Sequence, residues 1–146
     1  MKTVSENRRA RFDYEILETV EAGMMLTGQE VKSCRMGHIN LTGSYVSFHS
    51  GKPILKNASI ARYVHTSKLE PYDEHRDRPL LLSRADIRKL TTRTEEKGLT
   101  VVPLAVHAGR FIKLLIGIGR GRKSIDKRQH IKEREVERVL KRTGNY

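Results

Sequence analysis

Apolar and polar residues alternate along several short stretches of this chain, a period of two that is typical of half-buried β-strands. The clearest pair, residues 99–107 and 111–118, flanks the turn sequence Ala108-Gly109-Arg110 and predicts a hairpin. Further strands are predicted from Phe12 into Glu21, and over 44–49 and 53–63. The predicted apolar faces of the hairpin are Thr100, Val102, Leu104 and Val106 on the first strand, and Ile112, Leu114, Ile116 and Ile118 on the second.

Two short helices are predicted by their start signals. Thr27 with Glu30 three residues later forms a capping box, and this helix should stop at Gly37. Ser83 with Asp86 repeats the signal and predicts a second helix. About five or six antiparallel strands with two short helices favour a small closed barrel, because closure removes exposed sheet edges.

The chain carries a strong excess of positive charge. The chain of 146 residues carries 29 Lys and Arg against 17 Asp and Glu, a net charge of +12. Half of that excess lies between Arg120 and Arg142, where ten Lys and Arg face four acids. Such a segment repels itself, so an anionic partner lowers its energy and releases counterions. The basic C-terminal tail, residues 119–146, therefore indicates binding to nucleic acid.

Composition also excludes several classes of protein. The only cysteine, Cys34, permits neither an internal disulfide nor a four-cysteine zinc site. No apolar run reaches the roughly 20 residues of a membrane span, and the N-terminus has no apolar signal region, so we expect a cytoplasmic protein without membrane contact. Phosphate-binding loops and nucleophile elbows are absent, and the GIGRGR sequence at 117–122 lacks the βαβ context of a dinucleotide site.

One polar loop offers an enzymatic alternative. His65, Asp73, Glu74 and His75 could hold a divalent ion for a nuclease, although their spacing fits no metal motif and a solvated loop is the preferred interpretation. A second alternative, based on charge alone, is a generic protein that binds ribosomal RNA or associates with the ribosome.

Six sequence motifs, in collinear order over nearly the whole chain, resemble the SsrA-binding protein family, also called small protein B. They are NRRARFDYEILETVEAG (7–23), TGQEVKSCRMGHINL (27–41), SYV (44–46), RPLLLSRADIRKL (78–90), KGLTVVPL (97–104) and GRGRKSIDKRQHIKER (119–134). Several motifs of this length in one order are far more specific than a basic patch.

The resemblance implies a mainly β fold: a six-stranded antiparallel oligonucleotide-binding (OB-fold) barrel with short flanking helices. It implies a basic N-terminal arm over 1–11, the barrel over 12–118, and a tail over 119–146 that is disordered in free solution. The part of the tail from about Asp126 onward is expected to become helical on the ribosome. The family binds the transfer-RNA-like domain of transfer-messenger RNA (tmRNA) and delivers it to stalled ribosomes for trans-translation. The implied protein is a monomer without cofactor or catalytic residues, acting with elongation factor Tu and alanyl-tRNA synthetase.

Family likeness also implies site residues. The expected tmRNA contacts are Asn7, Glu21, Leu81, Ser83 and Lys113, with Arg8, Arg9, Lys32, Arg35 and Asn40 as further candidates. The tail is expected to enter the empty messenger channel near the decoding centre of the small ribosomal subunit. Its expected contacts are Lys123, Ile125, Asp126, Lys127, Arg128, Ile131, Lys132 and Arg134; Ile125 stands where many relatives place an aromatic residue or His.

Side-chain chemistry supports some of these assignments and leaves others open. Asn7 can both donate and accept hydrogen bonds on a base edge or a ribose 2′-hydroxyl. Glu21 repels phosphate, so as a contact it must accept from a base amino group or orient a neighbouring Arg; the alternative is a charge on the barrel surface without a role in binding. Leu81 could pack in the core or offer a flat surface to a nucleoside.

Overall fold

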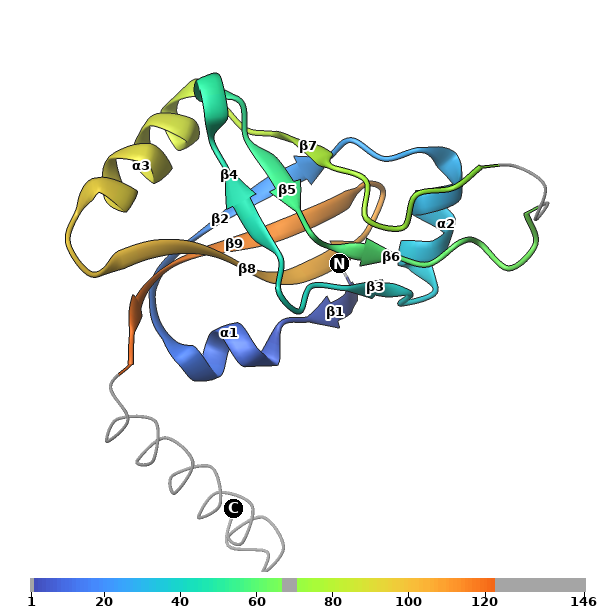
Figure 1. Cartoon of the computed structure of the whole chain (residues 1–146), viewed down its shortest axis with the longest axis horizontal. Helices are drawn as coiled ribbons and strands as arrows, with labels where there is room; N and C mark the ends of the chain where they lie inside the picture. Colours follow the sequence, from blue (N-terminus) through green and yellow to red (C-terminus); the bar gives the residue numbers. More distant parts are fainter. Residues whose placement is uncertain (1, 67–70, 123–146) are drawn as a thin grey trace, which may run out of the picture.

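The protein is described by a computed structural model that covers residues 2–66 and 71–122 (Figure 1). Within these ranges the chain forms short strands and helices that follow one another closely. In order they are β1 (Lys2–Glu6), α1 (Arg8–Asp13), β2 (Tyr14–Met24), α2 (Gly28–Arg35), β3 (Ile39–Asn40), β4 (Tyr45–Ser47), a 3-10 turn (His49–Gly51), β5 (Ile54–Lys56), β6 (Ser59–Ile60), β7 (Arg78–Leu81), α3 (Arg84–Glu95), β8 (Leu99–Ala108) and β9 (Ile112–Gly121).

Seven of the described strands form one antiparallel sheet in the order β1-β8-β9-β2-β7-β5-β4, and β3 pairs with β6. The large sheet is strongly curled, and its edge strand β1 reaches the small sheet, where the Ser5 hydroxyl donates to the Ile39 carbonyl at 2.9 Å. Helices α2 and α3 lie at opposite ends of the molecule, and α1 lies beside the start of β2 (Figure 1). The prediction of a mainly β, antiparallel fold with short flanking helices is confirmed.

Both helix start signals are confirmed. The Thr27 hydroxyl accepts from the backbone N–H of Glu30 at 3.2 Å, and the Glu30 carboxylate accepts from the N–H of Thr27 at 2.9 Å. The Ser83 hydroxyl accepts from the N–H of Asp86 at 3.1 Å. These side chains satisfy backbone donors that a helix cannot pair internally.

The predicted hairpin is present as β8 and β9, but one of its faces differs from the prediction. Ile112, Leu114, Ile116 and Ile118 all enter the main core, as expected. On β8, a register shift between Pro103 and Ala105 places Leu104 at a bulge, so the strand changes phase. Val106 therefore packs in the main core, whereas Val102 and Leu104 pack on the opposite face against Ala10 of α1. The predicted single face is wrong, because an alternating pattern does not reveal a bulge.

The N-terminal segment is more ordered than a basic arm. Residues Lys2–Glu6 form β1, which pairs with β8, and Arg8–Asp13 form α1. The strand predicted from Phe12 begins instead at Tyr14 and runs to Met24. Because β1 joins the sheet edge, the sheet has seven strands where the family likeness implies six.

The predicted strand over 53–63 is two strands. Asn57 adopts a φ of +64°, and this left-handed residue separates β5 from β6. β5 pairs with β4 and β7, whereas β6 pairs with β3. Asparagine tolerates this conformation better than most residues, so it lets the chain change sheets.

A buried ion network joins α2 to β7. The Glu30 side chain is 1% exposed, and its carboxylate lies 2.6 Å from Arg76 Nη2 and 2.8 Å from Arg78 Nη2. The Arg78 side chain is fully buried and also donates to the carbonyls of Ala58 and Glu74, at 2.8 and 2.9 Å. The network therefore fixes α2 against the strand that carries Leu81.

Candidate nucleic-acid interface

Four residues line up across neighbouring strands of the large sheet. Leu81 of β7 is opposite Gly23 of β2, Gly23 is opposite Lys113 of β9, and Lys113 is opposite His107 of β8. Directly paired residues of neighbouring strands point to the same face, and the flanking residues of these strands enter the core. Leu81, Gly23, Lys113 and His107, called here the cross-strand row, therefore share the outer face of the barrel.

The centre of this face is a shared carboxylate. One oxygen of Glu21 lies 3.3 Å from Lys113 Nζ, and the other lies 3.5 Å from His107 Nδ1. The side chains of Glu21 and Lys113 are each 35% exposed, and that of His107 is 21% exposed. Of the two contact roles considered for Glu21, the geometry favours orienting a neighbouring cation, and this cation is a lysine, Lys113, where an Arg was predicted.

Leu81 lies on the surface. It is 60% exposed, and a Cβ built on Gly23 would approach the Leu81 Cβ to 3.3 Å. The Leu81 side chain thus lies against Gly23, whose missing side chain leaves room for this leucine at the surface. Ser83 lies two residues beyond Leu81, at the start of α3, where its hydroxyl is engaged as the helix cap.

More cations gather at the turn of the β8–β9 hairpin, close to Lys113. Arg35 of α2 donates from Nη1 to the Gly109 carbonyl at 2.8 Å and from Nη2 to the Arg110 carbonyl at 3.2 Å. The Arg110 guanidinium lies 5.6 Å from the ring centroid of Phe111, which is 64% exposed. Arg35 thereby holds the hairpin turn that carries Arg110, three residues before Lys113. Arg35 and Arg110 are called here the rim cations.

Lys32 and Asn40 are not members of the cross-strand row. The Lys32 ammonium is 5.4 Å from the ring centroid of Tyr63, a cation–π arrangement on α2. The Asn40 side chain accepts from the backbone N–H of Thr42 at 2.9 Å and shapes the turn after β3. Asn40 thus belongs to the two-stranded sheet, whereas Lys113 belongs to the seven-stranded sheet.

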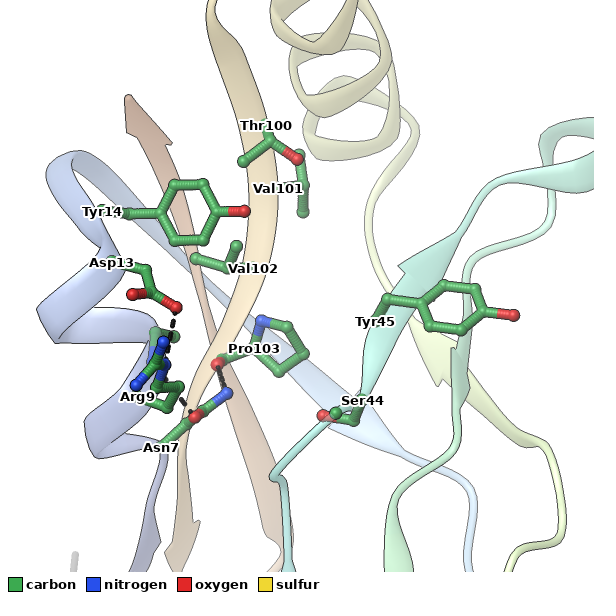
Figure 2. A pocket seen from close by; sticks show the side chains of 12 residues that line it. Asn7, Arg9, Asp13, Tyr14, Ser44, Tyr45, Thr100, Val101, Val102 and Pro103 are labelled. Carbon is green, nitrogen blue, oxygen red and sulfur yellow. Dashed lines mark hydrogen bonds and ion pairs between the residues drawn. The ribbon is translucent and has the colours of Figure 1, made fainter. Parts of the chain in front are cut away.

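Asn7 has a structural role (Figure 2). It is 6% exposed; its amide donates to the Pro103 carbonyl at 2.9 Å and accepts from the N–H of Ala10 at 3.2 Å. Both ends of this side chain fasten α1 to the edge of β8. Arg8 and Arg9 follow it on the exposed side of α1, and Arg9 pairs with Asp13 at 3.0 Å.

The structure thus brings Glu21, Leu81 and Lys113 onto one face, with Arg35 at its rim, and places Asn7, Arg8 and Arg9 on α1. Sequence reasoning missed His107 and Gly23, because only strand register shows that they adjoin Lys113. The expected ribosome contacts from Lys123 to Arg134, and the expected disorder or helicity of the tail beyond Arg122, lie outside the described residues.

The enzymatic alternative gains no support from the arrangement of the polar loop. Across residues 2–66 and 71–122, no group of three or more His, Cys, Asp or Glu side chains is placed to hold a metal ion. Asp73 instead accepts from the N–H of His75 at 2.9 Å, and the Glu74 carbonyl accepts from Arg78. Burial raises the pKa of Cys34 to about 12, which keeps this thiol protonated and unreactive.

Comparison with known proteins decides the family. A family model described as SmpB protein matches residues 4–145. The chain belongs to the SmpB family. An SsrA-binding protein from Prochlorococcus marinus subsp. pastoris is 48% identical over 141 residues, which cover 96% of this chain and 81% of the relative. Another, from Coprothermobacter proteolyticus, is 45% identical and covers 99% of this chain and 97% of the relative.

A solved structure extends this family likeness to three dimensions. A chain from "tmRNA-SmpB: a journey to the center of the bacterial ribosome" superposes with a TM-score of 0.69 at 43% identity. The match covers 87% of this SmpB-family chain and 93% of the solved one. In addition, none of the helices in the described part of the chain is long and apolar enough to cross a membrane.

Proposed function

We propose that this chain binds the transfer-RNA-like domain of tmRNA and delivers it to stalled ribosomes in trans-translation. The observation that carries the proposal is the match of the family model over residues 4–145, together with relatives named SsrA-binding protein. The solved SmpB chain named with tmRNA and the bacterial ribosome supports the same partners. The protein acts in the cytoplasm as a monomer, without catalysis or a cofactor.

We assign the tmRNA to the outer face that carries the cross-strand row. Lys113 and the rim cations Arg35 and Arg110 contact phosphates, while Leu81, which lies against Gly23, offers an apolar surface. Asn7 acts by positioning Arg8 and Arg9 on α1, because its own polar groups are used within the protein. With few aromatic side chains in the sequence, shape and backbone recognition fit this face better than rows of stacked bases.

The tail supplies the second contact. Its net charge of +6 suits ribosomal RNA, and we assign the messenger channel near the decoding centre to it. Elongation factor Tu and alanyl-tRNA synthetase act on the same RNA while the barrel holds it. In this proposal the barrel supplies the affinity for tmRNA, and the tail supplies the contact with the ribosome.

Binding measurements with competing RNAs test the proposal. The full chain should prefer the transfer-RNA-like domain over a structured ribosomal RNA fragment of equal length by about tenfold or more, a difference of about 1.4 kcal/mol. Equal affinity for both RNAs would favour the generic RNA-binding alternative. Sequencing the RNA that co-purifies with the protein from its own cells should identify one dominant species, tmRNA.

A matched pair of leucine variants tests the assigned face. Leu81 and Leu17 are both exposed, at 60% and 41%, but only Leu81 belongs to the cross-strand row. Leu81→Ala should weaken binding of the transfer-RNA-like domain about fivefold, as expected for about 1 kcal/mol of lost apolar contact, and Leu17→Ala should not. Equal effects of the two substitutions would contradict the assignment of the RNA to this face.

A further inference from the structure

His107 is the one member of the cross-strand row that has no assigned role. Its Nδ1 atom lies 3.5 Å from Glu21 Oε2, while the other oxygen of that carboxylate lies 3.3 Å from Lys113 Nζ. His107 and Lys113 are also direct partners across β8 and β9. The Glu21 carboxylate therefore contacts both His107 and Lys113, which are adjacent on the outer face.

This arrangement determines which atom of the ring is available to a ligand. A carboxylate at one ring nitrogen of a histidine orients the imidazole and leaves the opposite nitrogen for a partner. With Nδ1 toward Glu21, the nitrogen left to the outer face is Nε2, and the side chain is 21% exposed. The ring is held beside a lysine, and its Nε2 atom can donate a hydrogen bond when the imidazole is protonated.

We propose that His107 contacts an RNA phosphate through Nε2, and that Glu21 orients its ring while sharing its charge with Lys113. The inference rests on the proposed function of this face and adds a residue to it. When His107 is protonated, its Nε2–H group becomes a charged donor. The charged ring also attracts the Glu21 carboxylate more strongly through Nδ1–H. Lys113 is then less neutralised and binds phosphate more strongly.

The charges around His107 set the sign of the effect. Glu21 on β2 is the acid in contact, Lys113 faces it from β9, and Arg110 with the Arg35 guanidinium lies at the hairpin turn. On β1, Thr3 is the direct partner of His107, and the charged residues of that strand are Lys2 and Glu6. An incoming phosphate adds negative charge beside the ring and favours its protonated form. RNA binding then takes up a proton, and affinity rises as pH falls.

The test measures the dissociation constant for the transfer-RNA-like domain at fixed ionic strength, from about pH 8 to about pH 5.5, where histidine changes charge. The wild-type protein should bind about threefold to fivefold more tightly at the acid end, the range of an exposed charge contact. His107→Gln should lose this gain, and His107→Lys should bind tightly at both ends. His49→Gln is the matched control, because His49 is exposed in the 3-10 turn, outside the cross-strand row, and should keep the wild-type response.

Each outcome decides between distinct conclusions. An equal pH response in the wild-type protein and His107→Gln would overturn the role of His107 and leave tmRNA binding intact. Failure of the wild-type protein to prefer this RNA at any pH would instead overturn the proposed function. If His107→Gln unfolds, His107→Lys still decides the matter, since its affinity must stay high and flat with pH. A decline at alkaline pH in that variant contradicts the proposal.

Discussion

Replacing Glu30 by Gln is the sharpest test of how the barrel is held together. The substitution preserves the size of the side chain and removes one charge from a buried network. Both carboxylate oxygens are in use, with Arg76 Nη2 at 2.6 Å from one and Arg78 Nη2 at 2.8 Å from the other. Glu30 is 1% exposed and Arg78 is fully buried, so water cannot replace the lost charge.

The expected cost follows from which contacts survive. A glutamine oxygen can still accept from the N–H of Thr27, so the helix cap persists, and Arg78 keeps its two carbonyl acceptors at 2.8 and 2.9 Å. What is lost is the counter-charge of a buried guanidinium, and leaving one partner of a buried pair alone costs about 3 kcal/mol or more. Arg76 is 39% exposed, so Arg76→Gln should cost only about 0.5 to 1 kcal/mol.

The pH dependence of stability gives a second signature. Burial alone would raise the pKa of Glu30, but hydrogen bonds from Arg76, the Thr27 backbone and Arg78 outweigh it and hold this pKa below the ordinary value of 4.5. A carboxyl whose folded pKa is depressed stabilises the protein above the unfolded pKa and loses that contribution as pH falls through the folded pKa. The gap in stability between wild type and Glu30→Gln should therefore be constant near neutrality and narrow below about pH 4.5.

Urea unfolding followed by circular dichroism, at neutral and acid pH, measures both effects. The free energy of unfolding should fall by about 3 kcal/mol in Glu30→Gln at neutral pH, with Arg76→Gln as the comparison. A loss below about 1 kcal/mol, or equal losses in the two variants, would refute the reasoning that the buried charge pair needs both partners. A gap that stays constant through acid pH would contradict the assigned direction of the Glu30 pKa.

Three further predictions concern RNA contacts and packing. Lys113→Ala should weaken binding of the transfer-RNA-like domain and reduce the slope of log affinity against log salt by about 0.7 to 0.9, and an unchanged slope would mean no phosphate contact. Gly117→Ala should cost about 1 to 3 kcal/mol in thermal unfolding, because the new Cβ would lie 2.6 Å from Leu104 Cδ1, whereas Gly121→Ala, with nothing within 4 Å, should be neutral. Truncation after Arg122 should leave affinity for the transfer-RNA-like domain within about twofold and abolish tagging on stalled ribosomes; loss of both would refute the division between barrel and tail.

Local signals in the sequence were sufficient for the helix starts and the hairpin. The capping hydrogen bonds at Thr27 and Ser83 join residues three apart, so the residue types alone predict them. Strand β1 had no such signal, because KTVSE does not alternate and its stability comes from pairing with β8, about a hundred residues away. The bulge at Leu104 was equally invisible, since a change of phase depends on what each face packs against.

In the candidate site, too, some residues could be predicted from the sequence and others became apparent only from the strand register. Family likeness pointed to Glu21, Leu81 and Lys113, and the strand register explains why these distant positions belong together. His107 belongs to none of the sequence motifs, and only its position opposite Lys113 in the strand register makes it a candidate site residue. Asn7 was expected on the surface for its ability to donate and accept, and those same abilities are what the protein uses to fasten α1.

Acidic side chains of the barrel fix the positions of several of its cations. Each of three glutamates binds two basic side chains: Glu18 with Lys89 and Arg93, Glu30 with Arg76 and Arg78, and Glu21 with His107 and Lys113. Part of the positive charge of the barrel is thus paired with these glutamates, which fix the positions of the basic side chains. Unfixed cations bind any polyanion and lose affinity steeply with salt, whereas oriented ones recognise a particular arrangement of phosphates. On the proposed RNA face we therefore expect the Glu21 carboxylate to reduce raw attraction and to increase selectivity for an RNA whose phosphates match Lys113 and its neighbours.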